Sequence, residues 1–160
     1  MLSELNYLIT LEFENLDRLA NEMRLLLPKA EKETSFIQIR AAGSILHDFY
    51  SGIEKIFERI AVAIAIDQNL PEGENWHTEL LCQMAKPVEG KRNSVISEDL
   101  MQRLKEYLRF RHLFRHIYGF ELKWDRIKPL CVDMEVVLGK LRREINDFLS
   151  GYRQPNLPNG

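Results

Sequence analysis

Cysteine is scarce in this sequence: its 160 residues include two cysteines, Cys82 and Cys131, which are far apart and form no C-x-x-C pair. A disulfide-stabilised secreted fold or a thiolate zinc site needs several suitably spaced cysteines, so the sequence favours neither. We expect two buried free thiols.

Long hydrophobic runs are also missing. The longest apolar stretch, Ile60 to Ile66, falls far short of the roughly 20 residues that a membrane-spanning helix needs. The segment Met1 to Glu4 has no basic region leading into an apolar one, so no secretory signal or transit peptide is apparent. The sequence therefore predicts a cytoplasmic protein without a membrane segment.

An excess of charge of one sign is absent as well, because 22 Lys and Arg face 24 Asp and Glu, which gives a net charge of -2. Any attraction to nucleic acid must therefore come from a local basic patch. The 45% hydrophobic content suffices for the core of one domain at this length. We expect that domain over residues 1–150 and a flexible C-terminal tail over 151–160, where Pro155, Pro158 and Gly160 lie.

Apolar residues recur at steps of three and four along most of the chain, which is the pattern of amphipathic helices. The first series, ended by Pro28, contains Leu2, Leu5, Ile9, Phe13, Leu16, Ala20, Met23 and Leu27; the second contains Phe36, Ile39, Gly43, Leu46, Tyr50, Ile53, Phe57, Ile60 and Ile64. A short helix near Trp76 to Met84, one from Ser97 to about Tyr118 and one after Asp125 follow. Strand-like alternation is not apparent, so the sequence predicts an all-α, four- to five-helix antiparallel up-and-down bundle.

The predicted fourth helix concentrates positive charge. Between Arg103 and Arg115 there are four arginines and one lysine against the single Glu106. Such a patch suits a phosphate backbone, with Arg109 and Arg115 as candidate RNA-binding residues, although a solvated basic face is the more ordinary use of a charge run alone.

Arg111 falls within the apolar stripe of this helix rather than on its basic face. Burying an unpaired guanidinium would cost several kcal/mol, so Arg111 needs a carboxylate, a carbonyl, a subunit boundary or a bound phosphate as its partner. The apolar residues around it, Phe110, Leu113 and Ile117, exceed what a peripheral helix requires, and burial against a second subunit would use the surplus.

His112 and His116 have the i, i+4 spacing of a two-histidine metal site, but no H-E-x-x-H pattern and no third ligand accompany them. We predict neither a metal nor a cofactor. Arg111, His116 and Tyr118 instead offer a phosphate-binding cation, a group that exchanges protons near neutral pH, and a phenol, which suit RNA cleavage without a metal. Arg111 and His116 lie about 140° apart on an ideal helix. Their convergence therefore requires the helix to end or distort between them, or a cleft lined by two copies of the chain.

The stretch Arg111 to Tyr118, RHLFRHIY, fits the R-x4-H-x-Y motif of HepT toxins, and the chain resembles this family of the HEPN superfamily. Residues 46–60 and 118–122 are also similar to HepT-like proteins.

This resemblance implies a HEPN-like bundle and a homodimeric, metal-independent ribonuclease with Arg111 and His116 as its catalytic pair. It also implies supporting roles for His112, the polar residue that follows the arginine, and for Glu54, an acidic partner for Arg111 on the second helix. A minimal nucleotidyltransferase antitoxin is implied too, which would inactivate the toxin by transferring AMP to Tyr118. The alternative is a non-catalytic helical interaction module that binds RNA or a nucleotidyltransferase without cleaving anything.

Overall fold

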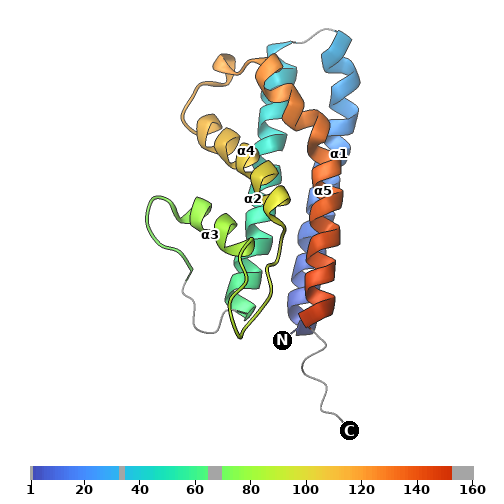
Figure 1. The fold of residues 1–160 in the computed structure, drawn as a ribbon. Coiled ribbons are helices and arrows are strands. Elements are labelled where there is room, and N and C mark those ends of the chain that lie inside the picture. The colour runs from blue at the N-terminus through green and yellow to red at the C-terminus, as the bar shows by residue number, and fades with distance from the viewer. Residues whose placement is uncertain (1, 33–34, 65–69, 153–160) are drawn as a thin grey trace.

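The fold is that of a computed structural model, which describes residues 2–32, 35–64 and 70–152 (Figure 1). The described chain contains the helices α1 (Leu2–Lys32), α2 (Phe36–Ile64), α3 (Trp76–Met84), α4 (Glu98–Phe114) and α5 (Trp124–Tyr152), with a single 3-10 turn, η1 (Gly119–Glu121), between the last two. An isolated bridge between Val88 and Arg92 is the one β-type pairing in these residues. The all-α expectation is confirmed.

The three long helices α1, α2 and α5 lie alongside one another, and the shorter α3 and α4 pack on α2 (Figure 1). Helix α2 runs antiparallel to α1, and α5 runs in the same direction as α2 (Figure 1). Helix α2 is the spine of the bundle because it contacts all four other α-helices and η1. Its fully buried side chains include Leu46, Phe49, Tyr50, Ile53, Ile56, Phe57 and Ile60.

The apolar residues that recur periodically in the sequence form the core of the bundle. Leu5, Ile9, Phe13, Leu16, Ala20 and Met23 of α1 are buried, as are Ile127, Met134, Val137, Leu141, Ile145 and Phe148 of α5. Between α4 and α5, the Tyr107 hydroxyl donates a hydrogen bond of 2.7 Å to the backbone oxygen of Leu130. Among the described residues, no helix combines the length and the apolarity needed to cross a membrane.

Three helix ends differ from the prediction, those of α1, α5 and α4. Helix α1 does not stop at Pro28 but continues to Lys32 with the proline inside it. Proline has no backbone N–H, so the carbonyl oxygen one turn earlier in the helix loses its donor. Because Pro28 is exposed, water can donate to that oxygen instead. Helix α5 extends through Gly151 to Tyr152, so the first two residues of the expected tail are helical. Residues 153–160 lie outside the described part of the chain.

Helix α4 ends at Phe114, four residues before the predicted Tyr118. The backbone N–H of His116 donates to the oxygen of Leu113 at 3.0 Å, which tightens the last turn. The chain then turns back towards α2, where Leu122 becomes buried. Gly43 of α2 makes this docking possible, because a Cβ there would lie 2.8 Å from Leu122 Cδ1 and 3.0 Å from Phe114 Cε2.

Candidate active site

The centre of the site is a carboxylate in the hydrophobic core. Glu54 lies on α2, and its side chain is 6% exposed. A buried carboxylate is costly unless both of its oxygens find partners. Here Oε1 accepts a hydrogen bond from Arg111 Nη1 at 3.0 Å, and Oε2 lies 2.7 Å from His77 Nδ1. Three helices, α2, α3 and α4, thus each contribute one charged or titratable group to a single cluster.

Arg111 has the partner that its position in the apolar stripe demands. Its side chain is 13% exposed, and its Nη1 forms the ion pair with Glu54. Its Nε is buried and finds no hydrogen-bond partner among the described residues. The guanidinium is therefore fixed through Nη1, and Nη2, which takes no part in this ion pair, carries the donors that suit a further acceptor such as a phosphate oxygen.

His77 is held on two sides. The ring of Trp76 lies 3.7 Å from the His77 ring, centroid to centroid. The short contact to the Glu54 carboxylate requires the proton to be on Nδ1, so Arg111 Nη1, 3.2 Å from that nitrogen, cannot donate to it as well. With Nδ1 committed to Glu54, Nε2 is the ring nitrogen that can exchange a proton.

The buried charge of Glu54 affects the pKa of two neighbouring groups. Burial first, and then the Glu54 charge, raise the pKa of Tyr50 well above its usual value. Partial burial and the same carboxylate raise the pKa of Glu58, one turn along α2. The core around Glu54 therefore disfavours further negative charge.

The remaining motif residues lie at the C-terminal end of α4. His112 and His116 are both exposed, and their rings meet edge to face with centroids 4.6 Å apart. Tyr118 is 70% exposed and stacks on Phe120 with centroids 5.2 Å apart. Helix α4 ends between Arg111 and His116. Such an end is one of the conditions under which these two side chains could converge. Among the described residues, no hydrogen bond or ion pair joins these two side chains directly.

The two arginines expected to bind RNA are both exposed. Arg109 donates to Glu106 at 2.6 Å on its own helix, an ion pair in solvent that contributes little to stability. Arg115 caps the end of α4 with its backbone N–H bonded to the Arg111 oxygen. Both side chains remain accessible to a polyanion.

His77 is the member of the cluster that the sequence did not reveal. Glu54 and Arg111 could be paired on the resemblance, and their contact is present at 3.0 Å. His77 stands in a short helix far from both in the chain, and neither a motif nor the periodicity singles it out. The approach of α3 to α2 and α4, a tertiary property, is what brings it to the carboxylate.

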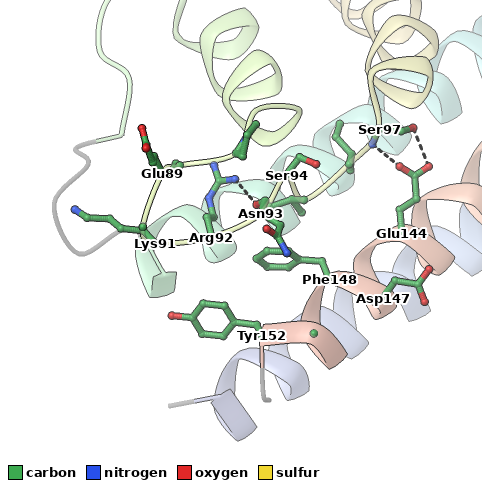
Figure 2. Close-up of a pocket in the computed structure, with 16 residues that line it drawn as sticks. Glu89, Lys91, Arg92, Asn93, Ser94, Ser97, Glu144, Asp147, Phe148 and Tyr152 are labelled. Atoms are coloured by element: carbon green, nitrogen blue, oxygen red, sulfur yellow. Dashed lines mark hydrogen bonds between the residues drawn. The ribbon is translucent and has the colours of Figure 1, made fainter. Parts of the chain in front are cut away.

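Possible metal ligands and a cavity were each compared with the predicted site residues, and neither coincides with them in the described part of the chain. Within the described residues, no group of three or more His, Cys, Asp and Glu side chains could hold a metal ion. A cavity of about 840 Å³ lies between the 87–97 loop and the C-terminal end of α5, and none of the predicted site residues lines it (Figure 2). There, Ser97 donates through its backbone N–H and its hydroxyl to Glu144, which ties the start of α4 to α5 (Figure 2).

The all-helical bundle, with a carboxylate of the second helix paired to an arginine near the end of the fourth, agrees with the HEPN-like class that the resemblance implied. A protein-family model described as HepT-like protein matches residues 41–152, which is more than half of the chain. The chain belongs to the HepT-like family of the HEPN superfamily. No curated protein and no solved structure matches it.

Proposed function

We propose that this protein is a metal-independent endoribonuclease and the toxin of a toxin–antitoxin pair. Membership of the HepT-like family favours a toxin of the HEPN type. The observation that carries the nuclease assignment is the end of α4 at Phe114, between a fixed arginine and an exposed histidine. His116 follows this end in an exposed position, with its ring against that of His112, so a substrate can reach it.

The chemistry follows from these two side chains. The 2′-hydroxyl of RNA attacks the adjacent phosphorus, and the bond to the 5′-oxygen breaks, which leaves a 2′,3′-cyclic phosphate and a 5′-hydroxyl. Arg111 stabilises the negative charge that accumulates on the phosphorane, and His116 takes part in the proton transfer. Arg109 and Arg115 bind neighbouring phosphates along the strand.

Purified protein incubated with single-stranded RNA and EDTA tests this proposal. We expect cleavage products with 2′,3′-cyclic phosphate ends, and loss of cleavage in Arg111→Ala and His116→Ala. Arg143→Ala is the matched control, because it removes an exposed arginine of α5 that has no role in the proposed site and leaves the Glu54 pair intact. RNA binding without any cleavage by the unmodified protein would instead identify a non-catalytic interaction module.

A homodimer is part of the proposal. Large apolar side chains are exposed around the end of α4 and the start of α2; they are Phe36, Ile37, Leu113, Tyr118 and Phe120. Arg40 of α2 lies against Gly119 of η1, which places these two segments together. A second copy is the occupant that best explains such a surface beside the motif. Light scattering should give the mass of a dimer, and Phe36→Ser with Phe120→Ser should yield a monomer with reduced cleavage.

We further propose that a minimal nucleotidyltransferase inactivates the protein at Tyr118. The exposed phenol oxygen would attack the α-phosphate of ATP and release pyrophosphate. Incubation with ATP and a minimal nucleotidyltransferase should add one AMP group, detected by mass spectrometry, and should abolish cleavage. Tyr118→Phe should remain unmodified, whereas Tyr7→Phe, which removes another exposed tyrosine, should be modified normally.

A further inference from the structure

We infer that His77 is a second proton-transfer residue of the proposed ribonuclease and accepts the proton of the attacking 2′-hydroxyl. This inference rests on the proposed function and adds a group outside the R-x4-H-x-Y stretch. His77 has a carboxylate on one ring nitrogen, a guanidinium beside it and an exposed fraction of 24%.

The contacts of His77 determine which nitrogen can react. Nδ1 carries the proton that the Glu54 carboxylate accepts at 2.7 Å, so Nε2 of the neutral ring has a free lone pair. A carboxylate behind an imidazole fixes its tautomer and orientation and stabilises the imidazolium that forms when Nε2 takes up a proton. Such a pair is suited to the role of a general base.

Charged side chains from two helices surround the His77 ring. Glu54 and Glu58 face it from α2, and Arg111 faces it from α4. Trp76 covers one face of the ring and restricts its rotation. The proposed base thus has both acidic and basic groups as neighbours.

Arg111 places the reacting phosphate next to His77. Its Nη1 lies 3.2 Å from His77 Nδ1, so a phosphate oxygen bound to this guanidinium is held beside the imidazole. RNA cleavage by the 2′-hydroxyl requires two proton transfers, one from the attacking oxygen and one to the leaving oxygen. Without His77, the proposed catalytic pair of Arg111 and His116 would leave both transfers to His116.

The assignment divides these transfers between two histidines. His77 Nε2 takes the proton of the 2′-hydroxyl as its oxygen bonds to phosphorus. The His116 imidazolium donates a proton to the 5′-oxygen as the bond from phosphorus to that oxygen breaks. His77 ends protonated and His116 neutral, and exchange with water restores both.

Two substitutions at His77 separate catalysis from positioning. In His77→Asn the side-chain amide can still donate to Glu54, but no group remains that can accept a proton; His77→Ala removes both functions. We expect both variants to cleave at least about 100-fold more slowly than the unmodified protein. Thr78→Ala, at an exposed neighbouring position of α3, is the control and should retain full activity. Thermal unfolding and circular dichroism establish that each variant is folded.

A modified substrate distinguishes the base from the acid. An RNA with sulfur in place of the bridging 5′-oxygen has a leaving group that departs without protonation. His116→Ala should regain most of its activity on this substrate, whereas His77→Asn should remain slow.

The outcomes are separable. If the unmodified protein does not cleave RNA, the proposed function fails and this inference fails with it. If it cleaves and folded His77→Asn retains its rate, the nuclease stands and His77 is a positioning residue at most. If the sulfur substrate restores His77→Asn and not His116→Ala, the two roles are reversed and the assignment as the base is wrong.

Discussion

Replacement of Glu54 by glutamine removes one negative charge from the core and leaves the shape of the side chain almost unchanged. The Glu54 and Arg111 side chains are 6% and 13% exposed, so their ion pair is almost fully buried. Breaking a buried pair costs about 3–5 kcal/mol, whereas surface pairs are worth about 0–1 kcal/mol. Because glutamine can still accept from Arg111 through its amide oxygen, we expect a loss of about 2–3 kcal/mol in the free energy of unfolding.

Urea unfolding of a double-mutant cycle measures this interaction. The variants are Glu54→Gln, Arg111→Met and the combination of the two, followed by circular dichroism. In Glu54→Gln the Arg111 guanidinium loses its charged partner, whereas the double variant has no guanidinium at this position. The double variant should therefore be more stable than the sum of the two single losses predicts. We expect a coupling energy above about 1 kcal/mol. For a chain of this size, a loss of 2–3 kcal/mol corresponds to a fall of roughly 4–12 °C in the melting temperature. Additive losses within about 0.5 kcal/mol would refute the pairing.

Three further predictions concern the scaffold. Gly43→Ala should destabilise the protein by about 1–3 kcal/mol, because the new Cβ would lie 2.8 Å from Leu122 Cδ1, while Gly139→Ala, with 3.6 Å to its nearest neighbour, should be neutral or stabilising; chemical denaturation compares them. Burial raises the pKa of Cys131 to about 12, so its thiol should resist iodoacetamide at pH 8 in the native state and react after unfolding, as peptide mass spectrometry can determine; rapid native labelling would contradict this burial. Ser97→Ala should cost about 1 kcal/mol, because it removes the hydroxyl that caps α4 at the Leu100 N–H and donates to Glu144; an unchanged urea midpoint would show that these two contacts together contribute nothing.

The helical architecture could be predicted because it depends on local periodicity. The step of three and four in α1, α2 and α5 specified which residues face the core, and residues such as Leu16, Ile53 and Leu141 are fully buried as expected. Helix ends depend less on periodicity. Pro28 is tolerated inside α1, whereas α4 stops early because the following segment docks Leu122 against α2.

The site could be predicted in part. Arg111 stood out because a guanidinium in an apolar stripe needs a partner, and the contact to Glu54 supplies one at 3.0 Å. The roles of His112, His116 and Tyr118 remain proposals that rest on the motif. His77 was beyond the reach of the sequence, since a histidine at the start of a short helix carries no periodic or motif signal. Its significance arises from the packing of α3 against two helices that are distant in the chain.

The carboxylate of Glu54 is shared by groups from two other helices, and this has a consequence for the newly synthesised chain. The second helix leaves the ribosome before either of the elements that complete the cluster, so the cluster assembles after α3 and α4 have both been made and docked. During refolding, the proposed nuclease activity should therefore appear later than the helical signal. On the proposed function, an unfinished or partly unfolded chain would lack the complete site and could not cleave the RNA of the cell that makes it.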